Sequence, residues 1–261
     1  MHVDAFPAAS TSTTTQWDCA LIVAWQHPET RSISPVGLLE RRGDDYRFRY
    51  LRVAEDVAGF RPFLNFPELR ANYVAKTLFP LFGERVMSPR RPDFGRYLAT
   101  LHLDADSTPM EILARSEGRR EADNVQLLPI PDVDADGRTT CRFLVHGVRH
   151  AIRQDPRAEA RISSLQAGNR LVLVPEPTNP KNPHALLTCT SDDAQHSIGW
   201  APDLLVPYLH AVRSVAEPEI TVEHVNGPEV PAHLRVLARL SGRMPVGFRP
   251  FSGPEWSTFS D

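Results

Sequence analysis

Hydrophobic and polar positions alternate in short blocks along the chain, and the first blocks predict strands. Residues 19–25, CALIVAW, form an apolar run typical of a buried strand. Residues 34–51 contain an apolar segment, a Gly-Asp turn and the alternating YRFRYL, which together predict a β-hairpin. VQLLPIP, at 125–131, predicts one more short strand.

Helical patterns occupy the region between these strands. Apolar residues approximate one helical face over 68–82, and Pro92-Asp93 precedes a second predicted helix at 94–101. The clearest helix start is in residues 107–116, where Ser107 or Thr108 can cap and Glu111 suits the positive end of the helix. The first half therefore predicts a mixed α/β module.

The second half changes to many short strands separated by turn signals. The strand candidates are residues 142–148, 169–174, 185–190, 196–200, 220–225 and 233–240. Helices are predicted at 156–166 and 202–212. Many short strands with one or two helices are typical of a small barrel or a strongly bent sheet. The predicted fold class is α+β, with the mixed module followed by an OB-like β-barrel.

The same patterns predict a division of the chain. Residues 1–16, rich in Ser and Thr, are expected to be disordered, and the first module covers 17–131. The acidic, turn-rich stretch 132–140 predicts a linker, the barrel is placed at 141–242, and 243–261 form a tail. The tail aromatics are expected to pack against the body, with an exposed interaction tail as the alternative.

Composition narrows the function classes. The 261 residues are 41% hydrophobic and carry a net charge of −3, which is ordinary for a globular protein and is no general signature of nucleic-acid binding. A basic patch must therefore be local, and 142–170 contain six arginines against Asp155 and Glu159. Three scattered cysteines predict reduced thiols. Without a secretory signal or a long apolar run, the sequence predicts a cytoplasmic protein with no membrane contact.

Motifs for catalysis, cofactors or metals are absent from the sequence. There is no phosphate-binding G-x-x-x-x-G-K-[ST], no G-x-S-x-G and no H-E-x-x-H. The acidic stretch that begins at Asp132 resembles a calcium loop, but Phe143 stands at the twelfth position, where a glutamate is needed. The interpretation is a binding protein without catalytic residues, cofactor or metal.

Three segments point to a family. FLVHGVRH, LQAGNRLVLVPEPTNPKNPHAL and SIGWAPDLLVPYL follow one another between residues 143 and 209. Their order and spacing resemble the HIRAN domain, a small modified OB-like barrel found beside helicases and alone in bacteria. In that family the ligand is single-stranded DNA, held near its 3′ end. The resemblance implies that this chain binds DNA, either single-stranded or at DNA ends.

The resemblance also implies a binding site on the barrel rim. Arg149 would pair with a phosphate, His150 and Trp200 would stack on bases, and Lys181 would attract the backbone. The full set of candidates is Arg149, His150, Arg153, Arg170, Asn179, Lys181, Asn182, His184 and Trp200. A core position remains the alternative for Trp200, and an ordinary surface position the alternative for His150. The prolines and asparagines of loop 175–187 would make the site rigid.

The sequence departs from the family at two places. Lys181 and Asn182 follow Asn-Pro where the family has an aromatic and an acidic residue, and His150 stands where a tyrosine is common. Backbone binding is therefore expected to survive better than recognition of a free 3′ end.

The first module resembles the N-terminal subdomain of HipA-type kinases more weakly, through VGLLERRGDDYRFRYL, TLFPLFGERVM and TPMEILARSEGRREADNVQLLP. In that family this piece is not catalytic and can act as a regulatory chain. The alternatives to DNA binding are therefore a protein-interaction module that docks a partner through residues 17–131, and an accessory subunit of a separate helicase or nuclease.

Overall fold

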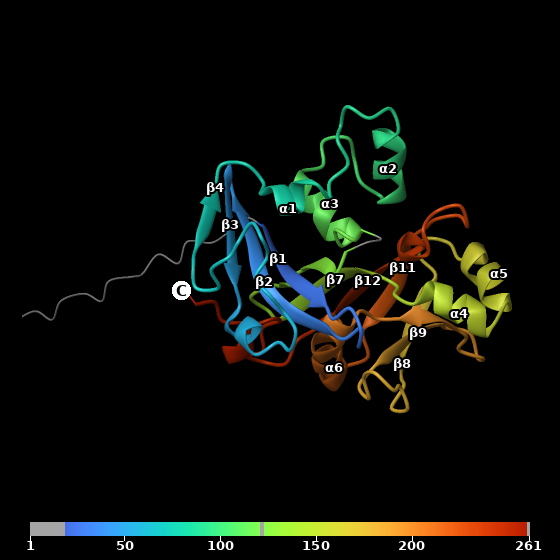
Figure 1. Ribbon diagram of the computed structural model, residues 1–261. Coiled ribbons are helices and arrows are strands. Elements are labelled where there is room, and N and C mark those ends of the chain that lie inside the picture. The colour runs from blue at the N-terminus through green and yellow to red at the C-terminus, as the bar shows by residue number, and fades with distance from the viewer. Residues whose placement is uncertain (1–18, 121–122, 260–261) are drawn as a thin grey trace, which may run out of the picture.

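Two antiparallel β-sheets with helices at their sides make up the protein. The computed structural model describes residues 19–120 and 123–259, and 24% of these residues are helical and 31% are in strands. The sheet of the first half lies beside that of the second half, with α2 and α3 on one side of the junction (Figure 1). The α+β class predicted from the sequence is confirmed, whereas the predicted disorder of residues 1–16 lies outside the described residues.

The first sheet has five strands in the order β4-β3-β2-β1-β5. Their bounds are Cys19–Gln26 (β1), Ile33–Arg42 (β2), Asp45–Tyr50 (β3), Tyr73–Ala75 (β4) and Val125–Pro129 (β5). β2 and β3 form the predicted hairpin, in which Leu39 lies opposite Phe48. The alternation in β3 buries Phe48 against Phe66 and Phe82, with ring centroids 4.4 and 5.5 Å away. The core of the first half is thus largely aromatic.

The helix predicted over 68–82 is wrong. This region contains only β4 and the short helix Pro80–Gly83 (α1). Pro80 has no N–H and begins α1, because it cannot lie inside a longer helix. The Tyr73 hydroxyl exchanges hydrogen bonds with the backbone N–H and C=O of Glu68, at 2.8 and 3.1 Å, and so fixes an irregular chain. The apolar residues there pack as part of the aromatic core.

The other two predicted helices of the first half are confirmed as Phe94–Thr100 (α2) and Pro109–Ser116 (α3). Thr108 caps α3, as the sequence indicated. Its Oγ1 accepts a hydrogen bond from the Glu111 N–H at 3.3 Å, and its own N–H donates to the Glu111 carboxylate at 2.7 Å. This capping box satisfies two backbone groups at the start of the helix.

The second sheet has seven strands in the order β10-β9-β8-β11-β12-β7-β6. Their bounds are Asp132–Val133 (β6), Arg138–Leu144 (β7), Arg170–Pro175 (β8), Leu186–Thr190 (β9), Ser197–Trp200 (β10), Glu219–Val225 (β11) and Val236–Arg243 (β12). β6 and β10 are its edges, and within residues 123–259 the sheet does not close into a barrel. The OB-like barrel expected from the sequence is therefore not confirmed.

The stretch 132–140, expected as a linker, belongs to this sheet. β6 pairs with Thr139 and Thr140 of β7. The Asp134 carboxylate accepts hydrogen bonds from the backbone N–H groups of Asp136 and Arg138, at 2.9 and 2.8 Å. The acidic residues therefore build the turn of a hairpin, which explains why the sequence looked like a connection between modules.

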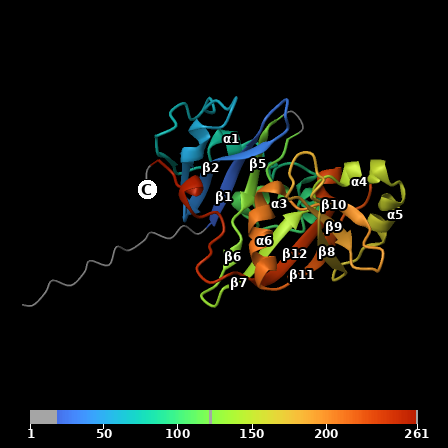
Figure 2. The ribbon, with the colours of Figure 1, turned by 90° about the horizontal axis from the view of Figure 1, so that it is seen from below.

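Three helices flank the second sheet: Val148–Gln154 (α4), Arg157–Ser164 (α5) and Val206–Val215 (α6). The predicted helices at 156–166 and 202–212 correspond to α5 and to η2 (Asp203–Leu205) with α6. α4 was not predicted, because its first residue, Val148, ends the strand predicted at 142–148. α4 and α5 lie at the end of the molecule farthest from the first sheet (Figures 1 and 2).

The two halves share a hydrophobic contact across the outer face of β7 and β12. Leu144 and Leu237, paired across these strands, pack with Leu98, Leu101 and Ile112 from the α2–α3 region. The opposite face of β7 carries the residues that alternate with Leu144, and these enter the core of the second half. One sheet is thus buried on both faces at this point, and the halves form a continuous body.

The C-terminal segment returns to the first sheet. Leu51 forms a β-bridge with Thr258, and the Arg52 N–H donates to the Ser257 carbonyl at 2.9 Å. Phe251 contacts Trp256 with ring centroids 4.5 Å apart, whereas Phe248 is 38% exposed. The tail therefore packs mainly against the body, as expected. None of the described helices is long and apolar enough to cross a membrane.

Candidate nucleic-acid interface

The proline-rich loop between β8 and β9 has a defined shape that its asparagines create. The Asn179 Oδ1 accepts hydrogen bonds from the backbone N–H groups of Lys181 and Asn182, at 3.0 and 3.2 Å. At the base of the loop the Glu176 N–H donates to the Ala185 carbonyl at 2.9 Å. The loop is a compact turn, because side chains replace the missing strand hydrogen bonds.

Trp200, at the end of β10, joins this loop to α4. Its Nε1 donates to the Glu176 carboxylate at 2.7 Å, and the same oxygen accepts from the Asn179 Nδ2 at 2.6 Å. Gly147, in the left-handed conformation with φ of 67°, lies against the indole, and a Cβ there would come within 2.4 Å of Cε3. Only glycine fits at this position. We use the term rim for residues 147–153, the loop 175–185 and Trp200.

His150 and Trp200 meet in the rim. Their ring centroids are 5.5 Å apart and the planes are tilted by 48°. Trp200 is partly buried and His150 is exposed. The two side chains therefore form one aromatic contact, whereas the sequence interpretation treated them as two separate platforms for bases.

The exposed cations of the rim come from α4 and from the loop tip. Arg149 and Arg153 are one helical turn apart on the same face of α4. Lys181 is exposed at the tip of the loop. No carboxylate within the described residues forms an ion pair with any of these three side chains.

The cluster of six arginines between 142 and 170 does not form one patch. Arg142 projects from the outer face of β7 and donates to both Glu223 oxygens, at 2.7 and 2.8 Å. Arg161 pairs with Asp155 at 2.7 Å. Arg170 begins β8 whereas the loop follows its last residue, so the two are separated by roughly 16 Å of strand. Arg170 therefore does not belong to the rim.

Asn182 and His184, also predicted to bind DNA, hold the loop in place, Asn182 through its side chain and His184 through its backbone. The Asn182 Nδ2 donates to the Asp203 carboxylate at 3.2 Å, and its Oδ1 accepts from the His184 N–H at 2.9 Å. The His184 carbonyl lies 2.9 Å from Nε2 of His210 on α6. These contacts hold the loop against η2 and α6, so both residues position the rim.

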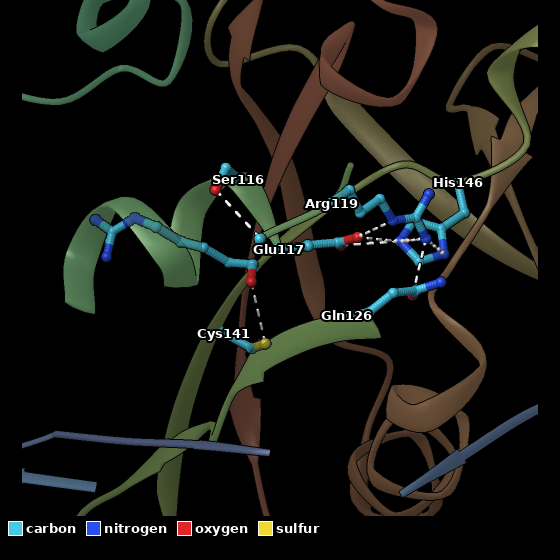
Figure 3. Close-up of polar contacts among 8 residues, drawn as sticks. Ser116, Glu117, Arg119, Gln126, Cys141 and His146 are labelled. Carbon is cyan, nitrogen blue, oxygen red and sulfur yellow. Dashed lines mark hydrogen bonds and ion pairs between the residues drawn. The ribbon is translucent and has the colours of Figure 1, made fainter. Parts of the chain in front are cut away.

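Behind the rim lies a buried polar cluster that the sequence interpretation missed (Figure 3). Glu117, which follows α3 in a left-handed conformation with φ of 55°, accepts from Nε2 of His146 at 2.8 Å. Nε of Arg119 lies 2.9 Å from the same carboxylate, and an Arg119 terminal nitrogen donates to Gln126 at 3.0 Å. The Glu117 side chain is only 5% exposed.

Burial by itself would raise the pKa of Glu117, but the neighbouring charges of His146 and Arg119 dominate and lower this pKa to about 2. A carboxylate at the C-terminal end of a helix opposes the helix dipole. A glutamate directly before Gly118 at a predicted helix end was thus the available sequence signal. Its partner could not be found from sequence, because His146 is 29 residues away.

The buried cluster and the rim share one backbone contact. The His146 N–H donates to the Trp200 carbonyl at 2.8 Å, and the Trp200 N–H donates to the His146 carbonyl at 2.9 Å. The side chain of His146 faces the first module, while Trp200 faces the loop. The position of the rim tryptophan is therefore tied to the contact between the two halves.

Two of the three cysteines lie in buried surroundings that affect their thiols. Burial raises the pKa of the Cys141 thiol to about 12 and that of Cys189 to about 11. Such thiols are poor nucleophiles at neutral pH. Among residues 19–120 and 123–259, no group of three or more His, Cys, Asp or Glu side chains could hold a metal ion.

Comparisons with protein families, with curated proteins and with solved structures found no match to this chain.

Proposed function

We propose that this protein binds single-stranded or frayed DNA at the rim. The observation that carries the proposal is the combination of three exposed cations, which have no carboxylate partner in the described chain, with a tryptophan that is fixed between α4 and a rigid loop. Phosphates would pair with Arg149, Arg153 and Lys181. A base would stack on the exposed part of the Trp200 and His150 contact.

The rigid loop favours binding because little conformational entropy remains to be lost when a ligand arrives. Arg149 and Arg153 stand on a helix and not on a loop, which keeps the spacing of their charges constant. Asn182 and His184 serve in this proposal as supports of the loop. Arg170 has no role in it.

Recognition of the free 3′ end is not part of the proposal. The residues after Asn179-Pro180 are Lys181 and Asn182, and neither can stack on a terminal base. We propose instead that binding depends on backbone charge and on single-stranded bases. This is the part of the activity implied by the HIRAN resemblance that does not need the family's aromatic and acidic residues, which Lys181 and Asn182 replace here.

We further propose that the second sheet is an opened relative of the HIRAN barrel. Bulges between Ser197 and Gly199 in β10 and between Val222 and His224 in β11 bend the strands, as happens at barrel corners. We also propose a cytoplasmic location and a role in repair, replication stress or defence.

The test is fluorescence anisotropy with a labelled single strand, the same strand with a blocked 3′ end, and a blunt duplex, in a salt series. We expect micromolar binding of both single strands and weaker binding of the duplex. With three phosphate contacts, the logarithm of the affinity should fall with a slope of about −2 against the logarithm of salt concentration. The variants Arg149→Ala and Lys181→Ala should each reduce this slope by about 0.7.

Arg61→Ala is the matched control, because Arg61 is an exposed arginine of the first half. It should leave binding unchanged, and all three variants should unfold like the wild type. Equal affinity of the wild type and Arg149→Ala, or no binding at low salt, would refute the proposal.

A protein-interaction role is the second candidate, and an observation in the first half favours it. Leu64 is 98% exposed and Val74, on the edge strand β4, is 59% exposed. Exposed apolar side chains and an open strand edge are typical of partner-binding surfaces. Either role is compatible with an accessory subunit of a separate helicase or nuclease.

A further inference from the structure

A cavity lies between the two halves, away from the rim. It has a volume of about 690 Å³. Its walls come from α3, from β5, β7 and β12, and from the C-terminal segment, represented by Ala114, Leu128, Arg142, Arg239 and Arg249. Cavities of 300–1,000 Å³ are typical of small-molecule sites.

Arg142 and Arg239 lie directly opposite each other on β7 and β12. Two like charges in this arrangement repel each other. Glu223 neutralises only part of this charge, because its carboxylate accepts two hydrogen bonds from Arg142 and also lies 3.8 Å from Arg115. The sheet therefore keeps an excess of positive charge at the wall of the cavity.

Arg239 and Arg249 supply that excess. Both are exposed, and neither forms an ion pair with a carboxylate in the part of the chain that the structure describes. Arg249 reaches the cavity from the C-terminal segment, whereas Arg239 reaches it from β12. Two separate elements thus place guanidinium groups around one space.

The acidic residues of the wall do not cancel these two charges. The Glu111 carboxylate accepts from the N–H of Thr108 in the capping box, and its charge acts on Arg115 of the same helix. Glu117 is paired with His146 and Arg119. Among the described residues, the one further carboxylate that lines the cavity is that of Asp132, exposed on β6. The available charge in the cavity is therefore predominantly positive.

The rest of the lining is mostly apolar and includes Leu103, Ala114, Leu128, Ile130 and Leu237. We propose that this cavity binds a small organic anion, with a phosphate, sulfonate or carboxylate group on Arg239 and Arg249 and an apolar or aromatic body against these side chains. Guanidinium groups recognise such anions by paired hydrogen bonds. The site is independent of the DNA-binding rim.

The experiment uses 8-anilinonaphthalene-1-sulfonate, which has a sulfonate on an aromatic body and fluoresces when it leaves water. The neutral N-phenyl-1-naphthylamine has nearly the same body without the charge. We expect one sulfonate probe to bind per chain, and Arg239→Gln/Arg249→Gln to weaken this binding at least tenfold. The weak binding of the neutral probe should be the same in both proteins.

Arg243→Gln is the matched control, since Arg243 is an exposed arginine of the same strand β12 that does not line this cavity. It should bind the sulfonate probe like the wild type. If the double variant unfolds at a lower temperature than the wild type, the single variant Arg249→Gln, in an exposed segment, decides the test. No saturable binding, several probes per chain, or unchanged affinity in the arginine variants would overturn the proposal.

Discussion

The ion-paired arginines of the first half and the exposed cations of the rim are used in opposite ways. In the first half, Arg47 and Arg49 both pair with the buried Glu40, at 2.8 and 3.2 Å, and Arg85 pairs with Asp123. In the rim, Arg149 and Arg153 are exposed and have no carboxylate partner among the described residues. The number of arginines in a segment therefore does not predict a binding surface. Paired charges support the fold, whereas unpaired ones remain available for a ligand.

Glu117 connects these two regions, because it is buried in the first half and contacts His146 in the segment that leads to the rim. Removing one residue of this cluster therefore tests whether its buried ion pairs stabilise the fold.

The largest effect is expected from Glu117→Ala. Without the carboxylate, the charges and polar groups of Arg119 and His146 would remain partly buried with no acidic partner. Removing one partner of a buried ion pair costs about 3–5 kcal/mol. Chemical denaturation should show a loss of this size in the free energy of unfolding, while Glu219→Ala, at an exposed site on β11, should change it by less than about 0.5 kcal/mol. A loss below about 1 kcal/mol in Glu117→Ala would show that the cluster is not structural.

The same ion pair should make the free energy of unfolding depend on pH, with an effect somewhat smaller than that of Glu117→Ala. The pKa of Glu117 is lowered from 4.5 to about 2 in the folded protein. Because a lowered pKa means that the folded state favours the ionised form, the stabilisation is present above about pH 4.5 and is lost as the pH falls towards 2. The difference corresponds to about 3 kcal/mol.

The measurement is the free energy of unfolding of the wild type and of Glu117→Gln between pH 6 and pH 2.5. The gap between the two proteins should narrow steadily below pH 4.5. A gap that stays constant over this range would contradict the lowered pKa.

The smallest effect is expected in the rim. Asn179→Ala removes two hydrogen bonds to the loop backbone and one to Glu176. Because the loop is exposed and water can replace these bonds, the cost should be about 1 kcal/mol. Hydrogen exchange should become faster at the amides of Lys181 and Asn182 only. Thr178→Ala, an exposed neighbour, is the control, and equal exchange in the two variants would show that Asn179 does not order the loop.

The sequence correctly predicted those elements that are stabilised by contacts between residues close together in the chain. Thr108, Pro109 and Glu111 determine the start of α3, and the alternation in YRFRYL determines β3. Asn179 was recognised as a residue that shapes its own loop, which its two backbone hydrogen bonds confirm. For such features the sequence pattern is enough, because the stabilising contacts are local.

The wrong predictions concern features that are decided by packing between residues far apart in the sequence. The helix over 68–82 was predicted from apolar spacing, but packing of Phe66 and Phe82 on Phe48 decides the conformation there. The second sheet was expected to close, and its strand order leaves β6 and β10 as edges. Propensity is a weak guide wherever tertiary packing offers a stronger alternative.

The sequence by itself determined the α+β class, most strands, the capped helix and the residues of the proline-rich loop. Only the tertiary structure decided which charges are neutralised, because ion pairs join residues such as Glu117 and His146 or Arg142 and Glu223, which are 29 and 81 positions apart. It also brought Arg239 and Arg249 to one cavity from separate elements. Charge pairing depends on distances in space, and no periodicity along the chain encodes these distances.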